Sequence, residues 1–406
     1  MDRRTFIKNS TLGFGSLLMS SLMSDVMQNA KAATVANGKT LVTVYVSGGY
    51  DGLSFFPAYG DPFYYTNRPT ISIPEADVLK ISDSNLFGFS PHLGGFREIY
   101  EAGDMSVFTA VDIDKPTRSH FNNQDLIFSQ LNDVARNGWI NEALKANNDL
   151  FLNGLKAFSL ESTTPHLMRG AHPVSYSNTT NINASIAVTR RNALQYFYDQ
   201  VKPLTDLNSY IKTTYKSFID DASLLSMFNA TNYAPSNGAV YEAKFGFDVR
   251  LKTAAYLIKN IKPNAIHMNY GYGFDTHENQ VANMQTGLPS LSKNLLAFYK
   301  DLGDQMKDVC ILVFSEFGRT MLENGTAGTD HGNANTWFAI GKNLNRGIYG
   351  NWAGLNPANL SSGNFLKRTI NAGDVFSEVL RSHLGLTNLN NVFSNYSYKN
   401  IGFIKS

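Results

Sequence analysis

The sequence predicts an α/β fold in which a mostly parallel sheet is covered by helices on both faces. Short runs rich in β-branched and apolar residues, such as TLVTVYV and VCILVF, alternate with longer stretches whose apolar residues recur at helical spacing. Parallel strands need long crossover connections, and the resulting sheet is buried on both faces. We find no internal repeat and no low-complexity linker, so residues 38–406 are expected to form one domain.

The expected elements follow one another along the chain in that alternating order. Strands are expected at 40–50, 106–113, 155–163, 184–189, 265–270, 309–314 and 336–341. Helices are expected at 96–103, where Gly103 ends the first of them, and at 121–135, 243–260 and 288–308. Residues from about 190 to 260 have helical spacing throughout, and we interpret them as a helical insertion in the domain.

Residues 1–32 have the parts of an export signal. Arg3 and Arg4 come first, an apolar segment of 13 residues follows at 11–23, and small residues at 30–32 suit cleavage. The order Arg-Arg-Thr-Phe-Ile-Lys resembles the twin-arginine signal of bacteria. We expect a periplasmic or secreted protein that meets the twin-arginine translocase during export and has no stable transmembrane segment afterwards. An ordinary amphipathic helix is the alternative interpretation of this segment.

The composition excludes several classes of protein. Hydrophobic residues make up 43% of the chain and charged ones 17%, which is typical of a folded chain. The chain has 35 basic and 33 acidic residues, and residues 1–32 hold 4 and 2 of these, so 31 of each remain. Without a basic surplus we expect no binding to nucleic acid. The single cysteine, Cys310, excludes an internal disulfide, and its apolar neighbours predict a buried, inert thiol.

Polar residues gather just after four of the expected strands, where sites form in parallel α/β sheets. In chain order they are Asp51; Thr117, Ser119 and His120; Asp275 and His277; and Glu316, Arg319, Asp330 and His331. Carboxylates and imidazoles are ligands of zinc and manganese, and converging carboxylates would repel one another without a cation. The sequence therefore predicts a divalent-metal site here. Its expected ligands are Asp51, Asp275, His277, Glu316, Asp330 and His331. Each fragment alone also fits a turn, a helix cap or a surface pair.

Thr117 and Ser119 lie where a loop enters a helix, next to His120. One interpretation is helix capping by a hydroxyl. The other is catalysis, because a hydroxyl at a helix N-terminus beside a metal loses its proton more easily and can attack phosphorus. Arg118 or Arg319 would then hold phosphoryl or sulfuryl oxygens through paired N–H donors.

Four further histidines lie outside these groups, two in predicted strands or helices and two beside prolines. His267 lies inside a strand and is expected in the core, and His383 lies on a helix and is expected to be structural. His92 and His172 each adjoin a proline and could rim a pocket.

Five motifs together resemble a known family. GGYDGL, TRSHF, GFDTHENQ, SEFGRT and TDHGN are similar to the bacterial family catalogued as domain of unknown function 1501, whose members commonly carry a twin-arginine signal. The resemblance spans nearly the whole chain after residue 38, and that family looks like a branch of the alkaline phosphatase and sulfatase superfamily. It implies an alkaline phosphatase-like α/β fold.

The resemblance also implies roles for single residues. Asp51 looks like the first-strand metal ligand, Ser119 or Thr117 like the nucleophile, and Asp330-His331-Gly332 like the Asp-His-Gly ligand motif. The Asp275-x-His277 spacing is narrower than the superfamily usually has, and Glu316 is an uncommon residue at its position. These departures leave the number of metal ions open.

Two functions follow as hypotheses. The first is an exported metal-dependent hydrolase of phosphate or sulfate esters, acting on a small-molecule or polymer substrate. Zinc is the first choice of ion, with manganese, calcium and magnesium as alternatives. The second is a non-catalytic exported protein that keeps the fold and acts in cell-surface assembly or polysaccharide binding, using its aromatic residues, 12% of the chain.

Overall fold

A sheet of eight strands organises the part of the chain that the computed structural model describes, which is residues 38–129, 131, 137–146, 157–170, 232–394 and 396–405. Its order is β10-β4-β8-β7-β1-β6-β5, and β9 also pairs with β4. The strands are β1 (Thr40–Tyr45), β4 (Met105–Asp112), β5 (Ala157–Ser159), β6 (Ala265–Asn269), β7 (Val309–Phe314), β8 (Asn335–Ile340), β9 (Gly347–Tyr349) and β10 (Ile370–Asn371).

All pairings in this sheet are parallel except those of β8, which is antiparallel to both β7 and β4. The predicted mostly parallel sheet is therefore confirmed. The reason for the exception is the connection from β7 to β8, which has no crossover helix and so returns the chain to the edge it has just left.

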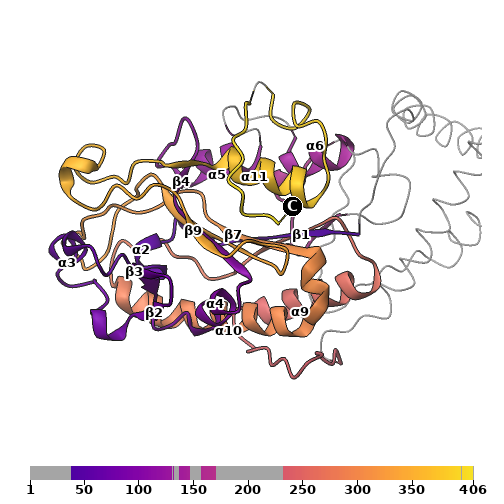
Figure 1. Cartoon of the computed structure of the whole chain (residues 1–406), viewed down its shortest axis with the longest axis horizontal. Coiled ribbons are helices and arrows are strands. Elements are labelled where there is room, and N and C mark those ends of the chain that lie inside the picture. Colours follow the sequence, from indigo (N-terminus) through magenta and orange to yellow (C-terminus); the bar gives the residue numbers. More distant parts are fainter. Residues whose placement is uncertain are drawn as a thin grey trace, which may run out of the picture.

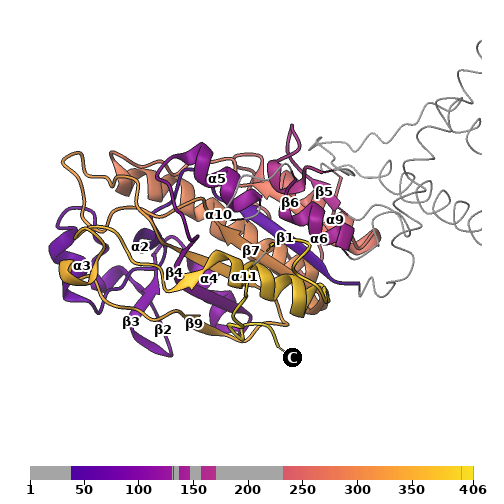
Figure 2. The ribbon, with the colours of Figure 1, turned by 90° about the horizontal axis from the view of Figure 1, so that it is seen from above.

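Helices cover both faces of the sheet, as Figure 1 shows. One layer contains α4 (Gly94–Glu101), α9 (Phe247–Asn260) and α10 (Gln280–Leu302), and the other contains α5 (His120–Phe128), α6 (Trp139–Ala146) and α11 (Ala372–Glu378). Figure 2 gives the view from above, onto the second layer. The remaining elements are α2 (Gly52–Phe55), α3 (Pro62–Asn67), the hairpin β2 (Leu79–Ile81) and β3 (Ser84–Phe89), the short helices η1 (Glu75–Asp77), η2 (His166–Met168), η3 (Gly303–Asp308) and η4 (Pro357–Asn359), and the π-helix η5 (Val379–His383).

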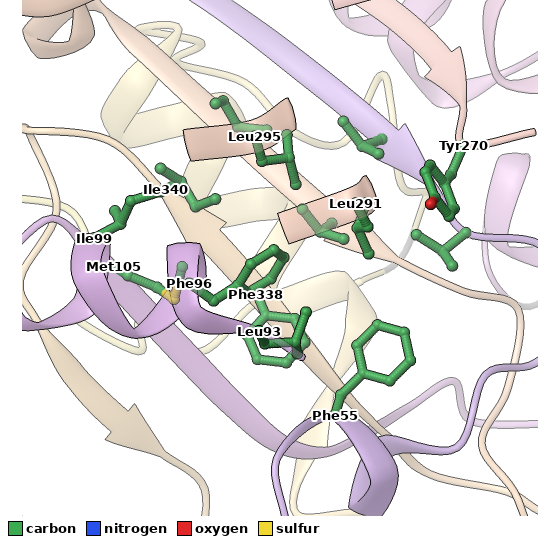
Figure 3. Close-up of a cluster of buried hydrophobic side chains, with 14 of the residues drawn as sticks. Phe55, Leu93, Phe96, Ile99, Met105, Tyr270, Leu291, Leu295, Phe338 and Ile340 are labelled. Carbon is green, nitrogen blue, oxygen red and sulfur yellow. The ribbon is translucent and has the colours of Figure 1, made fainter. Parts of the chain in front are cut away.

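The two faces bury separate apolar cores, and alternation along the strands supplies both. In β7, Val309, Ile311 and Val313 enter the core under α4, α9 and α10. Cys310, Leu312 and Phe314 enter the other core. A strand buried on both faces must be apolar at every position, which explains the uninterrupted VCILVF run. Figure 3 shows the first core, where side chains of α4, α10 and β8 pack together.

The expected elements are largely confirmed within the described residues. The expected helix at 288–308 corresponds to α10 and η3, but α10 already begins at Gln280. The expected strand at 184–189 and the first part of the predicted helical insertion lie outside the described residues. The last part of the predicted helical insertion forms α9, which lies next to α10 in the helical layer.

Cys310, His267 and His383 are expected to be buried or structural, and all three are buried. Cys310 is fully buried, and burial raises the pKa of its thiol to about 12. His267 is buried in β6 beside the hydroxyl of Thr43, with 2.9 Å between Nδ1 and Oγ1. His383 is buried and contacts the Thr40 carbonyl through Nε2 at 3.0 Å. Among the described helices, none is long and apolar enough to cross a membrane.

Candidate metal centre

Four side chains meet beyond the carboxyl ends of the parallel strands. His120 begins α5 after β4, Asp275 and His277 follow β6, and His331 lies on the connection from β7 to β8. Because β6, β1 and β7 are neighbours in the sheet, their carboxyl ends open on one edge. The structure thus brings together residues that are more than 200 positions apart in the chain.

Asp275 and His331 form the middle of this cluster. The Nε2 atom of His331 lies 3.2 Å from Asp275 Oδ1. On one side, His277 Nε2 lies 3.0 Å from His331 Nε2 and 3.1 Å from Asp275 Oδ1. On the other side, His120 Nε2 lies 3.3 Å from Asp275 Oδ2. Ligand atoms of His120, Asp275 and His331 all lie within 4.8 Å of one another.

Each of the three imidazoles is held through its Nδ1 atom by an oxygen acceptor. His120 Nδ1 lies 2.7 Å from Glu316 Oε1, and His277 Nδ1 lies 3.0 Å from Asp330 Oδ1. His331 Nδ1 lies 2.8 Å from the carbonyl oxygen of Arg118. A carbonyl oxygen only accepts, so Nδ1 of His331 carries the proton. Neighbouring oxygens of this kind fix the tautomer and orientation of metal-binding histidines.

The inward-facing nitrogens of these rings form a donor set that suits a cation. With Nδ1 protonated, a neutral imidazole presents a lone pair at Nε2, and two such lone pairs 3.0 Å apart repel each other. The Nε2 atom of His120 is buried and has no hydrogen-bond partner among the described residues. In a tetrahedral zinc site with bonds near 2.0 Å, ligand atoms are about 3.3 Å apart. The spacing and the donor set therefore fit a divalent metal.

Glu316 lies behind His120 and does not face the centre of the cluster. Its Oε1 accepts hydrogen bonds from His120 Nδ1 and from the Gly48 amide, and its Oε2 accepts from Tyr45 and Ser315. Burial acts to raise the pKa of Glu316, but these hydrogen bonds outweigh it and lower the pKa below its ordinary value. The geometry supports Glu316 as the residue that orients His120 rather than as a ligand.

Asp330 has the corresponding position behind His277. Its Oδ1 contacts His277 Nδ1 and, at 3.3 Å, the amide nitrogen of Asn324. The side chain is 61% exposed. The geometry therefore supports Asp330, like Glu316, as a residue that orients a histidine of the cluster, here His277, rather than as a metal ligand.

Arg319 is buried and therefore does not face a substrate. Its guanidinium group, 1% exposed, donates to four backbone carbonyls and to Asp275 Oδ1. The carbonyls belong to Gly48, Gly49, Phe274 and Thr329. Burial acts to raise the pKa of Asp275, but the hydrogen bond and charge of Arg319 outweigh it and lower the pKa to about 2. The expected clamp on ester oxygens is not supported, because the donors of Arg319 already have protein partners.

Asp51 does not join the cluster either. It is fully buried, and Arg68 donates to both of its oxygens, at 2.5 Å and 2.9 Å. Ser54 and Gln280 also donate to Oδ2, at 2.6 Å and 2.8 Å. Burial acts to raise the pKa of Asp51, but Arg68 outweighs it and lowers the pKa. The expected ligand role of Asp51 is not supported, since both of its oxygens already accept from buried donors.

The candidate nucleophiles lie directly before His120. Ser119 is the N-cap residue of α5, yet its hydroxyl does not cap the helix. The Thr117 hydroxyl makes long contacts with the Ser119 backbone, at 3.4 Å and 3.5 Å. Arg118 stacks its guanidinium over the Phe365 ring, 4.4 Å from the centroid. The capping interpretation of the two hydroxyls is therefore not supported.

The backbone around the cluster is held by close approach of its loops. Gly48 has φ of +99°, and a Cβ atom there would lie 2.6 Å from the Asp275 amide nitrogen. Residues 318–320 bridge back to 330–333, with 2.9 Å between the Thr320 amide and the Asp330 carbonyl. This bridge, together with the glycines that it needs at 318 and 332, turns His331 toward Asp275.

The structure also includes positioning residues that the sequence patterns do not reveal. They are Tyr45, Arg68, Asn123 and Gln280, all buried. The one local signal is an arginine within the otherwise uncharged stretch YYTNRPT. His92 is partly buried between β3 and α4, and His172 lies outside the described residues.

The fold and the edge cluster define an α/β protein with a histidine-rich candidate metal centre. Residues 253–391 match the model of a family described as "Protein of unknown function (DUF1501)". The predicted resemblance to that family is thereby confirmed for a segment that contains Asp275, His277 and His331. No curated protein matches the sequence.

Several solved structures are similar to this chain at low identity. A sulfatase, PsFucS1, from Pseudoalteromonas sp. is 12% identical, with 95% of this chain and 76% of that chain covered and a TM-score of 0.40. The phosphonate monoester hydrolase of Agrobacterium radiobacter is 10% identical, with 89% and 79% covered and a TM-score of 0.38. The zinc complex of the C-terminal periplasmic domain of EcEptC from Escherichia coli is 11% identical, with 75% and 73% covered and a TM-score of 0.34. Similarities at this level do not define an activity.

Proposed function

We propose that this chain is an exported metal-dependent hydrolase of phosphate or sulfate esters, with zinc as the first choice of ion. The observation that carries the proposal is the convergence of three imidazole Nε2 atoms on Asp275, each ring held from behind by an oxygen. His120, Asp275, His277 and His331 would hold the ion. A bound divalent ion would polarise an ester oxygen and lower the pKa of a nearby hydroxyl or water.

The hydroxyl of Ser119 is the proposed nucleophile. It lies at the N-terminus of α5, next to His120, and is not used as a cap. Attack by Oγ forms a bond to phosphorus or sulfur and breaks the bond to the alcohol oxygen, which leaves with a proton. Water then cleaves the seryl ester and restores the serine. The partial positive charge of the helix N-terminus favours the anionic group that is transferred. Thr117 is the alternative nucleophile.

Export is proposed on the twin-arginine pattern of residues 1–32, which lie outside the described residues. The mature chain would then act in the periplasm or outside the cell.

The test combines metal analysis with an ester screen. Purified protein is assayed for bound transition metal and for hydrolysis of p-nitrophenyl phosphate, bis-p-nitrophenyl phosphate and p-nitrophenyl sulfate. We expect turnover of at least one ester, loss of that turnover in Ser119→Ala and His120→Gln, and no loss in Asp304→Asn. Asp304 is 99% exposed and lies at the opposite edge of the sheet, before β7, so it is a matched surface control.

Each other outcome is informative. Metal binding without turnover of any ester would favour the non-catalytic exported protein. Turnover in Ser119→Ala that is lost in Thr117→Ala would move the nucleophile to Thr117. Protein that binds no transition metal when refilled after chelation would contradict the metal centre itself.

A further inference from the structure

The number of ions that the centre can take depends on its carboxylates. Paired catalytic metal ions lie about 3.5–4 Å apart and each needs its own ligands. Four carboxylates at this edge of the sheet are expected as ligands, namely Asp51, Asp275, Glu316 and Asp330. A second ion would need oxygens of these carboxylates that do not already have protein partners.

Two of these carboxylates, Asp51 and Glu316, already accept hydrogen bonds from protein donors at both oxygens. Both oxygens of Asp51 accept from Arg68, and Oδ2 accepts from two further side chains. Each oxygen of Glu316 accepts two hydrogen bonds. A metal ion at either position would have to displace these donors and leave the buried guanidinium of Arg68 or the partly buried His120 Nδ1 without a partner, which is costly.

The other two carboxylates offer ligands for one ion. Asp275 lies directly beside all three Nε2 atoms, at 3.2 Å from His331, 3.1 Å from His277 and 3.3 Å from His120. Asp330 contacts His277 through Oδ1, its side chain is 61% exposed, and it is not part of the ligand-atom group found among the described residues. His120, Asp275 and His331 place ligand atoms within 4.8 Å of one another, and His277 Nε2 adds a fourth atom 3.1 Å from Asp275 and 3.0 Å from His331. These side chains form one set, and four is the usual number of ligands for zinc.

A fixed protein cation already lies beside that set. The guanidinium of Arg319 is 1% exposed and bonds to Asp275 Oδ1. An arginine remains charged under all ordinary conditions. Its other donors are fixed by carbonyls of three loops, so the group cannot swing away to admit another ion.

We infer that the centre takes one divalent ion per chain, and that the Arg319 guanidinium supplies the second positive charge beside Asp275. This inference rests on the proposed function only in assuming that the centre binds metal. Arg319 is accordingly a positioning residue, because it acts through Asp275 and does not reach the substrate.

The direct test is the stoichiometry of metal binding. Purified protein is stripped with chelator and titrated with Zn²⁺ and, separately, with Mn²⁺, followed by native mass spectrometry and elemental analysis. We expect a plateau at one ion per chain, and none in His331→Gln. Two specifically bound ions would overturn the inference while leaving the metal centre standing. No bound ion would overturn the proposed function, and a single ion that persists in His331→Gln would place binding elsewhere.

A matched pair of variants tests the charge of Arg319. Arg319→Lys keeps the positive charge and Arg319→Gln removes it. Both variants lose the guanidinium group and its hydrogen bonds. A cation beside Asp275 repels the ion, so we expect Arg319→Gln to bind zinc more tightly than Arg319→Lys, by on the order of tenfold. Circular dichroism first establishes that both fold. Equal affinities, or tighter binding by Arg319→Lys, would contradict the charge role, and the wild-type stoichiometry tests the inference even where neither variant folds.

Discussion

Glu316 acts on the candidate metal centre through one hydrogen bond to His120. In Glu316→Gln the side chain keeps its size, but one oxygen becomes an amide that cannot accept from the donors around it. Loss of such a contact behind a metal-binding histidine typically costs roughly 10- to 100-fold in affinity, and we expect that range here. The measurement is competition for zinc against a chelator of known affinity.

The control for this variant is Glu75→Gln. Glu75 is an exposed glutamate that pairs with Lys80. It should leave zinc affinity unchanged. A Glu316→Gln protein that folds and binds zinc like the wild type would show that His120 is oriented by its packing alone, or is not a ligand.

His267 predicts how stability depends on pH. Burial lowers the pKa of His267 to about 3, whereas an unfolded chain has a histidine pKa near 6.5. The folded-state pKa is depressed, so stability is fully present above about pH 6.5 and is lost as the pH falls, because the unfolded chain takes up the proton first. The slope is about 1.4 kcal/mol per pH unit, which gives a loss of about 2 kcal/mol between pH 7 and pH 5.

The measurement is urea unfolding of the wild type and of His267→Gln at both pH values. We expect the variant to lose about 2 kcal/mol less than the wild type over this range. Asp112→Asn should change the profile in the opposite direction, because burial raises the pKa of the Asp112 carboxyl to about 7. Profiles of wild type and His267→Gln that run parallel would mean that His267 is protonated equally in both states.

The sequence predicts which side chains lie together at the sheet edge for some positions and not for others. Asp275, His277 and His331 meet as expected, because their place after strands determines which edge of the sheet they reach. Asp51 also lies after a strand, yet its pairing with Arg68 depends on how the chain folds back after α3. A pattern of strands and helices does not contain that information.

At the level of elements, the loop after β1 sets the distance between β1 and the loop that carries Asp275. We expect Gly48→Ala to lower zinc affinity and thermal stability together, since its Cβ would lie 2.6 Å from the Asp275 amide.

Gly103→Ala is the matched control. Gly103 also has a positive φ, of +90°. A Cβ there would have no atom of the described residues within 4 Å beyond its own chain neighbours. The substitution should cost about 1 kcal/mol of backbone strain and leave zinc affinity unchanged. Equal effects of the two variants on zinc affinity would show that strain rather than loop contact is responsible.

The direction of β8 is the feature that an alternating pattern does not specify. A run of alternating strands and helices predicts parallel pairing, and the strand expected at 336–341 would be one more of that kind. The connection before it holds Gly318, Gly325, Gly328 and Gly332 and no helical pattern. A connection without a helix favours an antiparallel return. That return places His331 at the same edge as the residues that follow β6 and β7.

At the level of the whole molecule, stability and metal binding should be separable. The cores lie on the two faces of the sheet, whereas the candidate centre lies beyond its carboxyl edge. An ion that binds only the folded chain stabilises it by about 2.7 kcal/mol at a free concentration of 100 times Kd. Zinc should therefore raise the melting temperature of chelator-stripped protein by several degrees.

Two histidine variants separate these effects. His383 is a core residue that contacts the amino end of β1, so His383→Gln should lower the melting temperature yet keep the increment caused by zinc. His331→Gln should keep most of the melting temperature without zinc, because its side chain is partly exposed, and lose the increment. Differential scanning calorimetry with and without zinc measures both quantities. An increment that survives in His331→Gln but disappears in His383→Gln would locate metal binding at the opposite edge of the sheet.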